Sequence, residues 1–301
     1  MDGLHYYKPK RLIGGTVHHP SENLERVSEI WAKAGADAVM IRPAPDELNA
    51  EFLNRVSSTS RDAGLRIVFH PSDEGNDNFS PSESRLHDFI LERFKLVFER
   101  MNQEPSVYEN LVIIHPPRTS HPEFQICGRR VLDERSAARN AAPFYDRLEL
   151  LASEFGVGVA IENIHAPFMS DRHAELGYTL SQLQDICSDR FGLCIDSAHA
   201  KLSWLGVRRL IDSGIPTLAA HIHGNWGQAD DHLLPTVNNV GSVQEFRALL
   251  KQKIPLMVEA RSDLILPASR LDGFSDYLKS AVRLLRDGKI PEEPQSREFK
   301  C

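Results

Sequence analysis

The fold can be worked out from the stretch Leu218-Ala219-Ala220-His221-Ile222-His223-Gly224-Asn225-Trp226-Gly227-Gln228-Ala229-Asp230-Asp231-His232. An apolar run ends in histidines and passes directly into an Asp-x-His loop. Imidazole nitrogens and carboxylate oxygens are the side-chain ligands that suit divalent zinc, manganese, cobalt or iron. The stretch therefore resembles the rim of a metal site. A polar surface loop with chance histidines is the alternative, and the ends of the other predicted strands decide between the two.

The composition is that of a large folded core. The chain has 301 residues, a formal net charge of -7 and 41% hydrophobic residues, which is too apolar for a disordered chain. No apolar run approaches the roughly 20 residues of a membrane span, and residues 1–6 lack the pattern of a signal peptide. We expect no membrane partner. The mild acidity gives no basic footprint for nucleic acid, although bound cations would offset site carboxylates locally.

The cysteines predict a reducing compartment. None of the four forms a Cys-x-x-Cys pair, so we expect free thiols in the cytoplasm. They are Cys127, Cys187, Cys194 and Cys301.

Eight short β-rich runs alternate with longer amphipathic runs along the whole chain. The predicted strands are 12–17, 36–42, 66–70, 111–115, 157–162, 191–196, 217–223 and 255–259. Nearly continuous apolar strands indicate a parallel sheet covered by helices, and eight strand-helix units close a (β/α)₈ TIM barrel. We predict one α/β barrel domain, 1–289, and a polar, mobile tail, 290–301. An open doubly wound sheet is disfavoured because no Gly-x-Gly-x-x-Gly follows the first strand.

Local signals place the helices between these strands. Ser80, Pro81 and Glu83 predict the start of a long helix, and Pro143 predicts a break or kink in a later one. Trp204 has the helical spacing of a core residue. The predicted helices are 21–34, 45–64, 80–101, 133–155, a short one capped by Thr179, 197–212, one capped by Ser242, and 269–286.

Six predicted strands end in side chains that can bind a metal. Side chains two residues apart on a strand share a face, and each of these six lies two positions after an apolar residue. Inward-pointing ligands above an inward apolar layer are therefore expected at the carboxyl ends of the strands, where barrel active sites lie. The ligand candidates are His70, His115, Glu162, Asp196, His221 and Glu259, above Val68, Ile113, Ala160, Cys194, Ala219 and Met257.

Three further candidates lie just beyond the strand ends. His199 follows Asp196 by three residues and is expected in the first turn of the next helix. Asp230 and His232 are alternate residues of an extended loop, so both can face one ion. His223 shares a face with His221 and could replace it as a ligand or contact the substrate.

The ordered set of motifs resembles the xylose-isomerase-like TIM-barrel superfamily, which joins sugar and sugar-phosphate isomerases and epimerases to endonuclease IV. The matching pieces are Ile161-Glu162-Asn163, Cys194-Ile195-Asp196-Ser197-Ala198-His199, His221-Ile222-His223, Asp230-Asp231-His232-Leu233 and Val258-Glu259.

The resemblance implies one to three divalent ions, with zinc or manganese expected first. A central metal would be held by Glu162, Asp196, His221 and Glu259. In the endonuclease branch a second metal would use His70, His115 and the shared Glu162, and a third would use His199, Asp230 and His232.

The surrounding sequence departs from the endonuclease branch. Pro116-Pro117-Arg118 stands where endonuclease IV-like chains have Pro-Gly-Ser, and Ala260-Arg261 replaces Thr-Pro. The loop Asp230-Asp231-His232-Leu233-Leu234-Pro235 is similar to the isomerase branch, but its usual Gly-Glu-Gly continuation is missing. The set of ligand residues alone favours an endonuclease, whereas the residues that follow those ligands in the sequence favour an isomerase.

Our first hypothesis is a metal-dependent isomerase, epimerase or dehydratase acting on a small sugar, sugar phosphate or related hydroxy-carbonyl compound. Glu162 and Glu259 would move a proton beside a metal-polarised carbonyl, though both could instead act purely as ligands. The substrate contacts predicted at the rim are Arg118, His223, Trp226 and Arg261, with Arg42 and Lys201 as further cations for a phosphate or carboxylate.

The alternatives are an endonuclease IV-like phosphodiesterase at abasic DNA and a barrel whose metal cluster only binds a ligand. The oligomeric state is left open.

Overall fold

Eight parallel strands close into a barrel in a computed structural model that describes residues 7–18, 20–71, 81–82, 84–119, 125–126, 129–130, 134–166, 174–235, 239–240, 243–260 and 274–288. Neighbouring strands follow the order β1-β12-β11-β10-β8-β4-β3-β2. The barrel strands are β1 (Ile13–His18), β2 (Ala38–Arg42), β3 (Arg66–Phe69), β4 (Tyr108–Ile114), β8 (Gly158–Glu162), β10 (Gly192–Asp196), β11 (Thr217–Ile222) and β12 (Leu256–Val258). The predicted (β/α)₈ barrel is confirmed.

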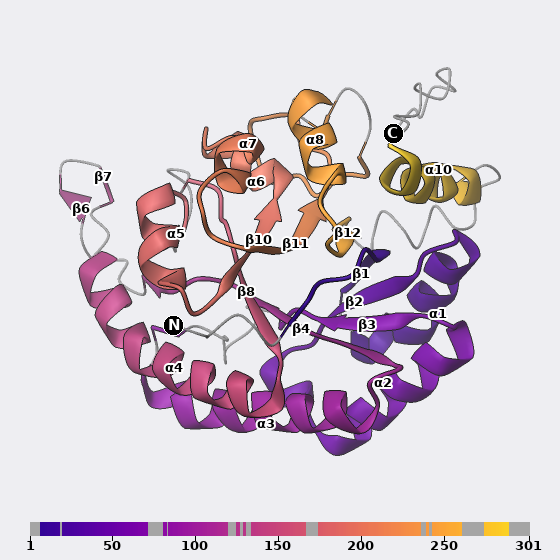
Figure 1. Cartoon of the computed structure of the whole chain (residues 1–301), viewed down its shortest axis with the longest axis horizontal. Helices are drawn as coiled ribbons and strands as arrows, with labels where there is room; N and C mark the ends of the chain where they lie inside the picture. Colours follow the sequence, from indigo (N-terminus) through magenta and orange to yellow (C-terminus); the bar gives the residue numbers. More distant parts are fainter. Residues whose placement is uncertain are drawn as a thin grey trace.

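Helices surround the strands on the outside (Figure 1). They are α1 (Pro20–Lys33), α2 (Ala50–Ala63), α3 (His87–Gln103), α4 (Glu134–Phe155), α5 (Leu180–Cys187), α6 (Ser197–Leu202), α7 (Val207–Ile211), α8 (Val243–Leu250) and α10 (Phe274–Asp287), with short 3-10 turns η1 (Pro45–Glu47) and η2 (Ser84–Leu86). No helix of the described ranges is long and apolar enough to cross a membrane.

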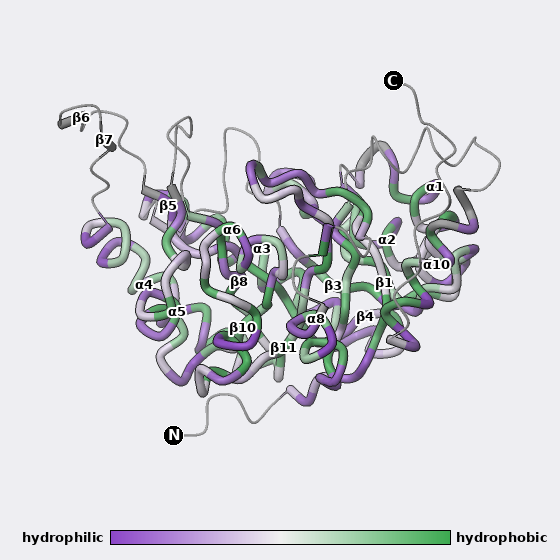
Figure 2. The backbone as a smooth tube through the Cα atoms, turned by 90° about the horizontal axis from the view of Figure 1, so that it is seen from above, coloured by the Kyte–Doolittle hydropathy of each residue, from purple (hydrophilic) through white to green (hydrophobic). Residues whose placement is uncertain are grey.

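Two small ribbons lie outside the barrel sheet. One pairs β5 (Arg118–Thr119) with β9 (Ala174–Glu175), and the other pairs β6 (Gln125–Ile126) with β7 (Arg129–Arg130). In Figure 2 β5 lies at the left of the molecule, to the upper left of the label of β8. Because β5 follows the end of β4, the first ribbon lies on the side where the barrel strands end.

The barrel interior is a separate apolar cluster beneath the strand ends. All six residues expected two positions before the ligand candidates belong to it, so the inward alternation predicted from the sequence is confirmed. The cluster comprises Tyr7, Leu12, Ala38, Met40, Val68, Leu111, Ile113, Ala160, Cys194, Leu218, Ala219 and Met257. This layer closes the barrel below the ligands, which leaves the carboxyl ends of the strands as the accessible side of the site.

A larger apolar cluster lies between the strands and the helices. Trp31 of α1 is fully buried there, and its indole Nε1 donates a hydrogen bond to the Thr16 backbone oxygen at 3.3 Å. Gly15 leaves room for this ring, because a methyl group at that position would overlap the indole. The missing side chain in β1 is therefore what lets α1 pack against the barrel.

Some helix boundaries differ from the sequence prediction. The long helix α3 begins at His87, because Pro81 and Ser82 form a turn in which the Pro81 oxygen lies 2.7 Å from His87 Nε2. Ser80 and Glu83, the predicted cap, lie outside the described residues. Pro143 lies inside α4, which continues through it, so the predicted break is not found.

The predicted helix 197–212 is two helices. Trp204 and Gly206 have φ values of 57° and 73°, which end α6 and turn the chain into α7. Trp204 is 93% exposed, so its assignment to the core was wrong. The left-handed backbone rotates the indole away from the face that the helical spacing assigned to it.

Several predictions fall on residues that the structure does not describe. They are the tail 290–301, the Ser242 cap, the first residues of the helix 269–286, Arg261, Cys127 and Cys301. The remaining cysteines, Cys187 and Cys194, are free and buried, as expected.

Gly15→Ala is expected to destabilise the protein by about 3 kcal/mol or more, because the new methyl group overlaps a fixed indole in a filled core. Gly35→Ala is the matched control: its φ of 84° is unfavourable for alanine, but no atom lies within 4 Å. We expect the control to lose only about 1–2 kcal/mol. Urea unfolding of both variants measures the difference, and equal losses would show that Trp31 does not pack on Gly15.

Candidate metal centre

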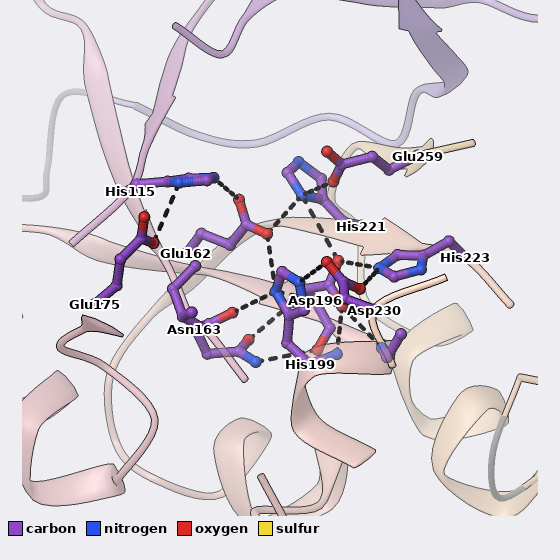
Figure 3. Close-up of polar contacts among 12 residues, drawn as sticks. His115, Glu162, Asn163, Glu175, Asp196, His199, His221, His223, Asp230 and Glu259 are labelled. Carbon is purple, nitrogen blue, oxygen red and sulfur yellow. Dashed lines mark hydrogen bonds and ion pairs between the residues drawn. The ribbon is translucent and has the colours of Figure 1, made fainter. Parts of the chain in front are cut away.

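Glu162 lies at the middle of the site and is surrounded by imidazole nitrogens (Figure 3). Its Oε1 lies 3.2 Å from both His199 Nδ1 and His221 Nδ1. Its Oε2 lies 3.1 Å from His70 Nε2 and 3.3 Å from His115 Nε2. Four histidines, three at the ends of β3, β4 and β11 and one in the first turn of α6, thus meet one buried carboxylate at the end of β8.

Asp196 ends β10 and caps the helix that follows. Its Oδ1 accepts hydrogen bonds from the backbone nitrogens of Ala198 and His199, at 2.8 and 2.7 Å. The Asn163 side chain bridges the two strand ends, accepting from Asp196 N at 2.8 Å and donating to Asp196 O at 3.1 Å. This N-cap starts α6 directly at the strand end, so His199 lies in its first turn, as predicted.

His221 points into the centre from β11. Its Nδ1 lies 2.7 Å from Glu259 Oε2 and 3.2 Å from Glu162 Oε1. Its Nε2 faces the Met40 sulfur at 3.1 Å. The nitrogen turned toward the carboxylates is therefore Nδ1.

Glu259 follows β12 and is held by a second partner. The Arg42 guanidinium, at the end of β2, donates a hydrogen bond to Glu259 Oε1. Both side chains are buried. Arg42 therefore orients Glu259 Oε2 toward His221, and it is engaged by the protein and does not project into solvent.

The residues of the centre fit a divalent cation. Among the described residues, several buried nitrogens and carboxylate oxygens face the centre without a hydrogen-bond partner, which is rare in folded proteins. A cation that accepts several lone pairs at once would satisfy them. These atoms are His70 Nε2, Glu162 Oε2, Asp196 Oδ2, His221 Nδ1 and Glu259 Oε2.

The centre contains two overlapping sets of ligand atoms, and within each set the atoms lie within 4.8 Å of one another. One contains His70, Glu162, His221 and Glu259, and the other contains Glu162, Asp196 and His199. Of the four residues expected to hold a central metal, Glu162, His221 and Glu259 share one set, and Asp196 shares the other with Glu162. His70 joins them, whereas it was expected at a second metal with His115.

A third set lies beside the centre, around the loop 224–233. It contains His199, Asp230 and His232, as predicted, together with His223. Asp230 Oδ2 lies 2.7 Å from His232 Nε2 and 3.2 Å from His199 Nε2. His221 belongs to the central set and His223 to the set with Asp230, although His223 Nε2 also lies 3.0 Å from Asp196 Oδ2.

Glu175 is a site residue that the sequence did not reveal. It reaches the site from β9, where its carboxylate contacts His115 Nδ1 at 3.3 Å and Arg118 Nε at 2.5 Å. No periodicity or motif marks a two-residue strand, so only the pairing of β9 with β5 shows this contact. His115 is therefore held between two carboxylates, Glu175 and Glu162.

The buried charges shift one another strongly. Burial works against its charged form, but His221 and the other histidines in close contact with it hold the pKa of Glu162 well below its usual range. The pKa of Glu259 is likewise low despite burial, because of His221 and Arg42. Burial and the Arg42 charge lower the pKa of His70 to about 4. Glu175 and Glu162 outweigh burial and raise the pKa of His115 to about 10.

The predicted substrate contacts have different outcomes. Arg118 is paired with Glu175 and so supports His115. Lys201 donates from Nζ to the Asn225 oxygen at 2.7 Å and braces the loop. Trp226 lies in that loop and is 63% exposed, which agrees with a position at the rim.

The chain belongs to the xylose isomerase-like TIM barrel family, whose sequence model matches residues 29–281. No curated protein matches the chain. The expected family and the expectation of an enzyme are confirmed.

Solved structures of sugar epimerases share the fold. A D-tagatose 3-epimerase-like protein is 16% identical, with a TM-score of 0.63 over 92% of this chain and 99% of its own. The 3-keto-D-glucoside 4-epimerase from E. coli is 14% identical, with a TM-score of 0.60 over 92% and 100%. The D-allulose 3-epimerase from Methylomonas sp. is 15% identical, with a TM-score of 0.62 over 93% and 99%.

Glu175→Gln is expected to destabilise the metal-free protein by roughly 3 kcal/mol near pH 6, because Arg118 and His115 lose a buried anionic partner. The folded pKa of His115, about 10, lies above its unfolded value of 6.5. Its contribution is therefore fully present below pH 6.5 and is lost as the pH rises through 10. The gap between variant and wild type should shrink over that range without vanishing, because Arg118 stays charged.

Urea unfolding at several pH values measures this gap. Glu149→Gln is the control, since Glu149 is a partly exposed partner of Arg190 at 4.0 Å and such pairs contribute about 1 kcal/mol or less. A gap that is independent of pH would show that Glu175 does not act on His115.

Proposed function

We propose that the protein is a divalent-metal-dependent isomerase or epimerase of a small sugar or related hydroxy-carbonyl compound. The observation that carries the proposal is the convergence of two buried carboxylates, Glu162 and Glu259, on one point. They come from β8 and β12, which are separated by β10 and β11 in the barrel, yet both lie within 3.2 Å of His221 Nδ1. The similarity to sugar epimerase structures supports the same reaction class.

Glu162, Asp196, His221 and Glu259 would hold the cation, with zinc or manganese as the first expectation. Their nitrogen and oxygen donors suit both metals. When bound there, such an ion polarises a carbonyl group and offsets negative charge that develops on neighbouring oxygens.

The two carboxylates supply the proton transfers. One ionised carboxylate removes the proton from the carbon next to the substrate carbonyl, and the other, once protonated, returns a proton to the same carbon or to its neighbour. Return to the opposite face of the same carbon gives an epimer, and return to the neighbouring carbon gives an isomer. The pKa of each carboxylate is held low, so ionisation does not separate their roles. We assign Glu259 as the base because Arg42 orients it, and Glu162 as its counterpart, which takes up a proton from one of the histidines that surround it.

The residues around the two carboxylates exclude bulk water, which favours proton transfer between the carboxylates and a bound substrate. Glu162, Asp196, His221 and Glu259 are all at most 1% exposed, and the apolar barrel interior closes the site from below. Exclusion of water strengthens every electrostatic contact in such a site. If the proton abstraction were followed by loss of the hydroxyl group β to the carbonyl, the enzyme would be a dehydratase.

Phosphodiester hydrolysis at abasic DNA is a second candidate. The observation that favours it is the third set of ligands, in which the residues expected at the third metal of an endonuclease IV-like cluster, His199, Asp230 and His232, come together. The sequence after His115 and after Glu259 departs from that branch, which is why we rank it second.

Glu259→Gln is expected to reduce solvent-deuterium incorporation into D-tagatose or D-allulose by at least about 10²-fold, because glutamine cannot accept the proton. The assay incubates manganese-loaded protein with each ketose in D₂O and follows loss of the carbon-bound proton by NMR. Glu25→Gln, at the surface, should behave as wild type. Exchange at the normal rate in Glu259→Gln would show that Glu259 is only a ligand.

Cleavage of an abasic-site oligonucleotide by the wild-type protein, without exchange in either sugar, would favour the second candidate. If the protein shows neither activity, the proposal is contradicted for these two ketoses.

A further inference from the structure

The central histidine has a sulfur atom behind it, on the side turned away from the carboxylates. His221 Nε2 lies 3.1 Å from Met40 Sδ, and both side chains are fully buried. Metal-binding histidines almost always donate their second ring N–H to a carboxylate, a backbone oxygen or a water molecule, so a thioether is an unusual partner. We infer that Met40 is a positioning residue, which holds the His221 ring so that Nδ1, and not Nε2, binds the metal.

The chemistry of the thioether carries the first argument. Met40 Sδ bears no hydrogen and can only accept a hydrogen bond, so the contact requires a proton on His221 Nε2. A protonated ring nitrogen has no lone pair to offer, and the hydrogen bond of one ring nitrogen decides whether the other binds a metal. Nδ1 is therefore the ligand atom. It lies 2.7 Å from Glu259 Oε2 and 3.2 Å from Glu162 Oε1, on the side where the candidate ligands meet.

The place of Met40 in the barrel explains how it reaches this histidine. Met40 and Arg42 are two residues apart on β2, so their side chains lie on the same face, and Met40 belongs to the interior cluster. In the strand order β2 is separated from β11 by β1 and β12, so the contact with His221 runs through the barrel interior. Arg42 makes a second such contact when it donates to Glu259. One strand thus supports two candidate ligands that other strands carry.

A second sulfur atom lies close to the same ring. Cys194 is fully buried in the interior cluster and is in close contact with His221. It pairs in register with Ala219, two residues before His221, which places it in the layer beneath the ligands. Two polarisable, weakly polar side chains therefore support the ring, and they do so mainly by packing. The hydrogen bond to Met40 is the contact that specifies which nitrogen carries the proton.

Met40→Leu removes the acceptor and keeps the packing, because leucine and methionine replace one another in cores at little cost. Met257→Leu is the matched control. Met257 is equally buried in the same cluster and pairs in register with His221, but its terminal methyl group packs against Gly14. Both changes are made in His232→Ala protein, in which the neighbouring set of ligands is weakened, so that zinc binding at the centre is measured.

Zinc affinity is the first readout, from competition with a chromogenic chelator. It is expected to fall at least about tenfold in Met40→Leu, as is typical when the partner of a metal-bound histidine is lost. Met257→Leu should bind zinc as tightly as its parent protein. Urea unfolding without metal checks that both variants keep the fold.

The ring proton is the second readout, and a role in packing alone would not determine it. In zinc-loaded parent protein containing isotope-labelled histidine, NMR should find the His221 proton on Nε2, a result that needs no variant at position 40. In Met40→Leu this proton loses its acceptor, so its resonance should move upfield. In Met257→Leu it should not move.

The inference rests on the metal centre of the proposed function but not on its reaction. Equal zinc affinities of Met40→Leu and Met257→Leu would overturn it, and so would a His221 proton on Nδ1 in zinc-loaded protein. The expected affinity and proton position, without deuterium exchange in any ketose, would support the inference and contradict the proposed reaction. Deuterium exchange with equal zinc affinities would do the reverse, and a protein that binds no zinc at the centre would overturn both.

Discussion

A buried carboxylate that cannot stay unpaired is the constraint on which this structure depends. Glu162 is 1% exposed at the end of β8. Moving an isolated carboxylate out of water costs several kcal/mol or more, so the surrounding strands must supply positive or polar partners. Four imidazole nitrogens within 3.3 Å do so. They can approach together only because a closed parallel barrel brings distant strand ends around one axis.

The imidazoles are in turn fixed by the backbone and by charged partners. Backbone oxygens of Ile113, Asn163 and Glu259 lie within 3.0–3.3 Å of Nδ1 of His70, His199 and His232, respectively. These carbonyls belong to neighbouring strand ends, so the strand order itself orients the rings. Arg42 and Arg118 hold the carboxylates of Glu259 and Glu175 from outside. Arg42 and Arg118, two of the four cations expected to meet a phosphate or carboxylate, thus contact the site's own acids.

Much of this arrangement could be predicted from the sequence, because it follows from the period of two along a strand. The ligands at the ends of six strands and the apolar residues beneath them obey that period. His199 could be placed because Asp196 is a good N-cap. What failed depends on contacts between distant segments. Glu175 lies in a two-residue strand, Arg42 meets a partner 217 residues away, and Trp204 is turned outward by its own left-handed backbone. His223 was expected to share a face with His221, but only the folded loop shows that it faces Asp196 and Asp230.

Anomalous X-ray diffraction from crystals of the manganese-loaded protein, measured on both sides of the metal absorption edge, tests the central claim most directly. The account predicts an anomalous peak bounded by the side chains of Glu162, Asp196, His221 and Glu259. A peak that contacts neither Glu162 nor Glu259, or no peak at the strand ends in fully loaded protein, would contradict it.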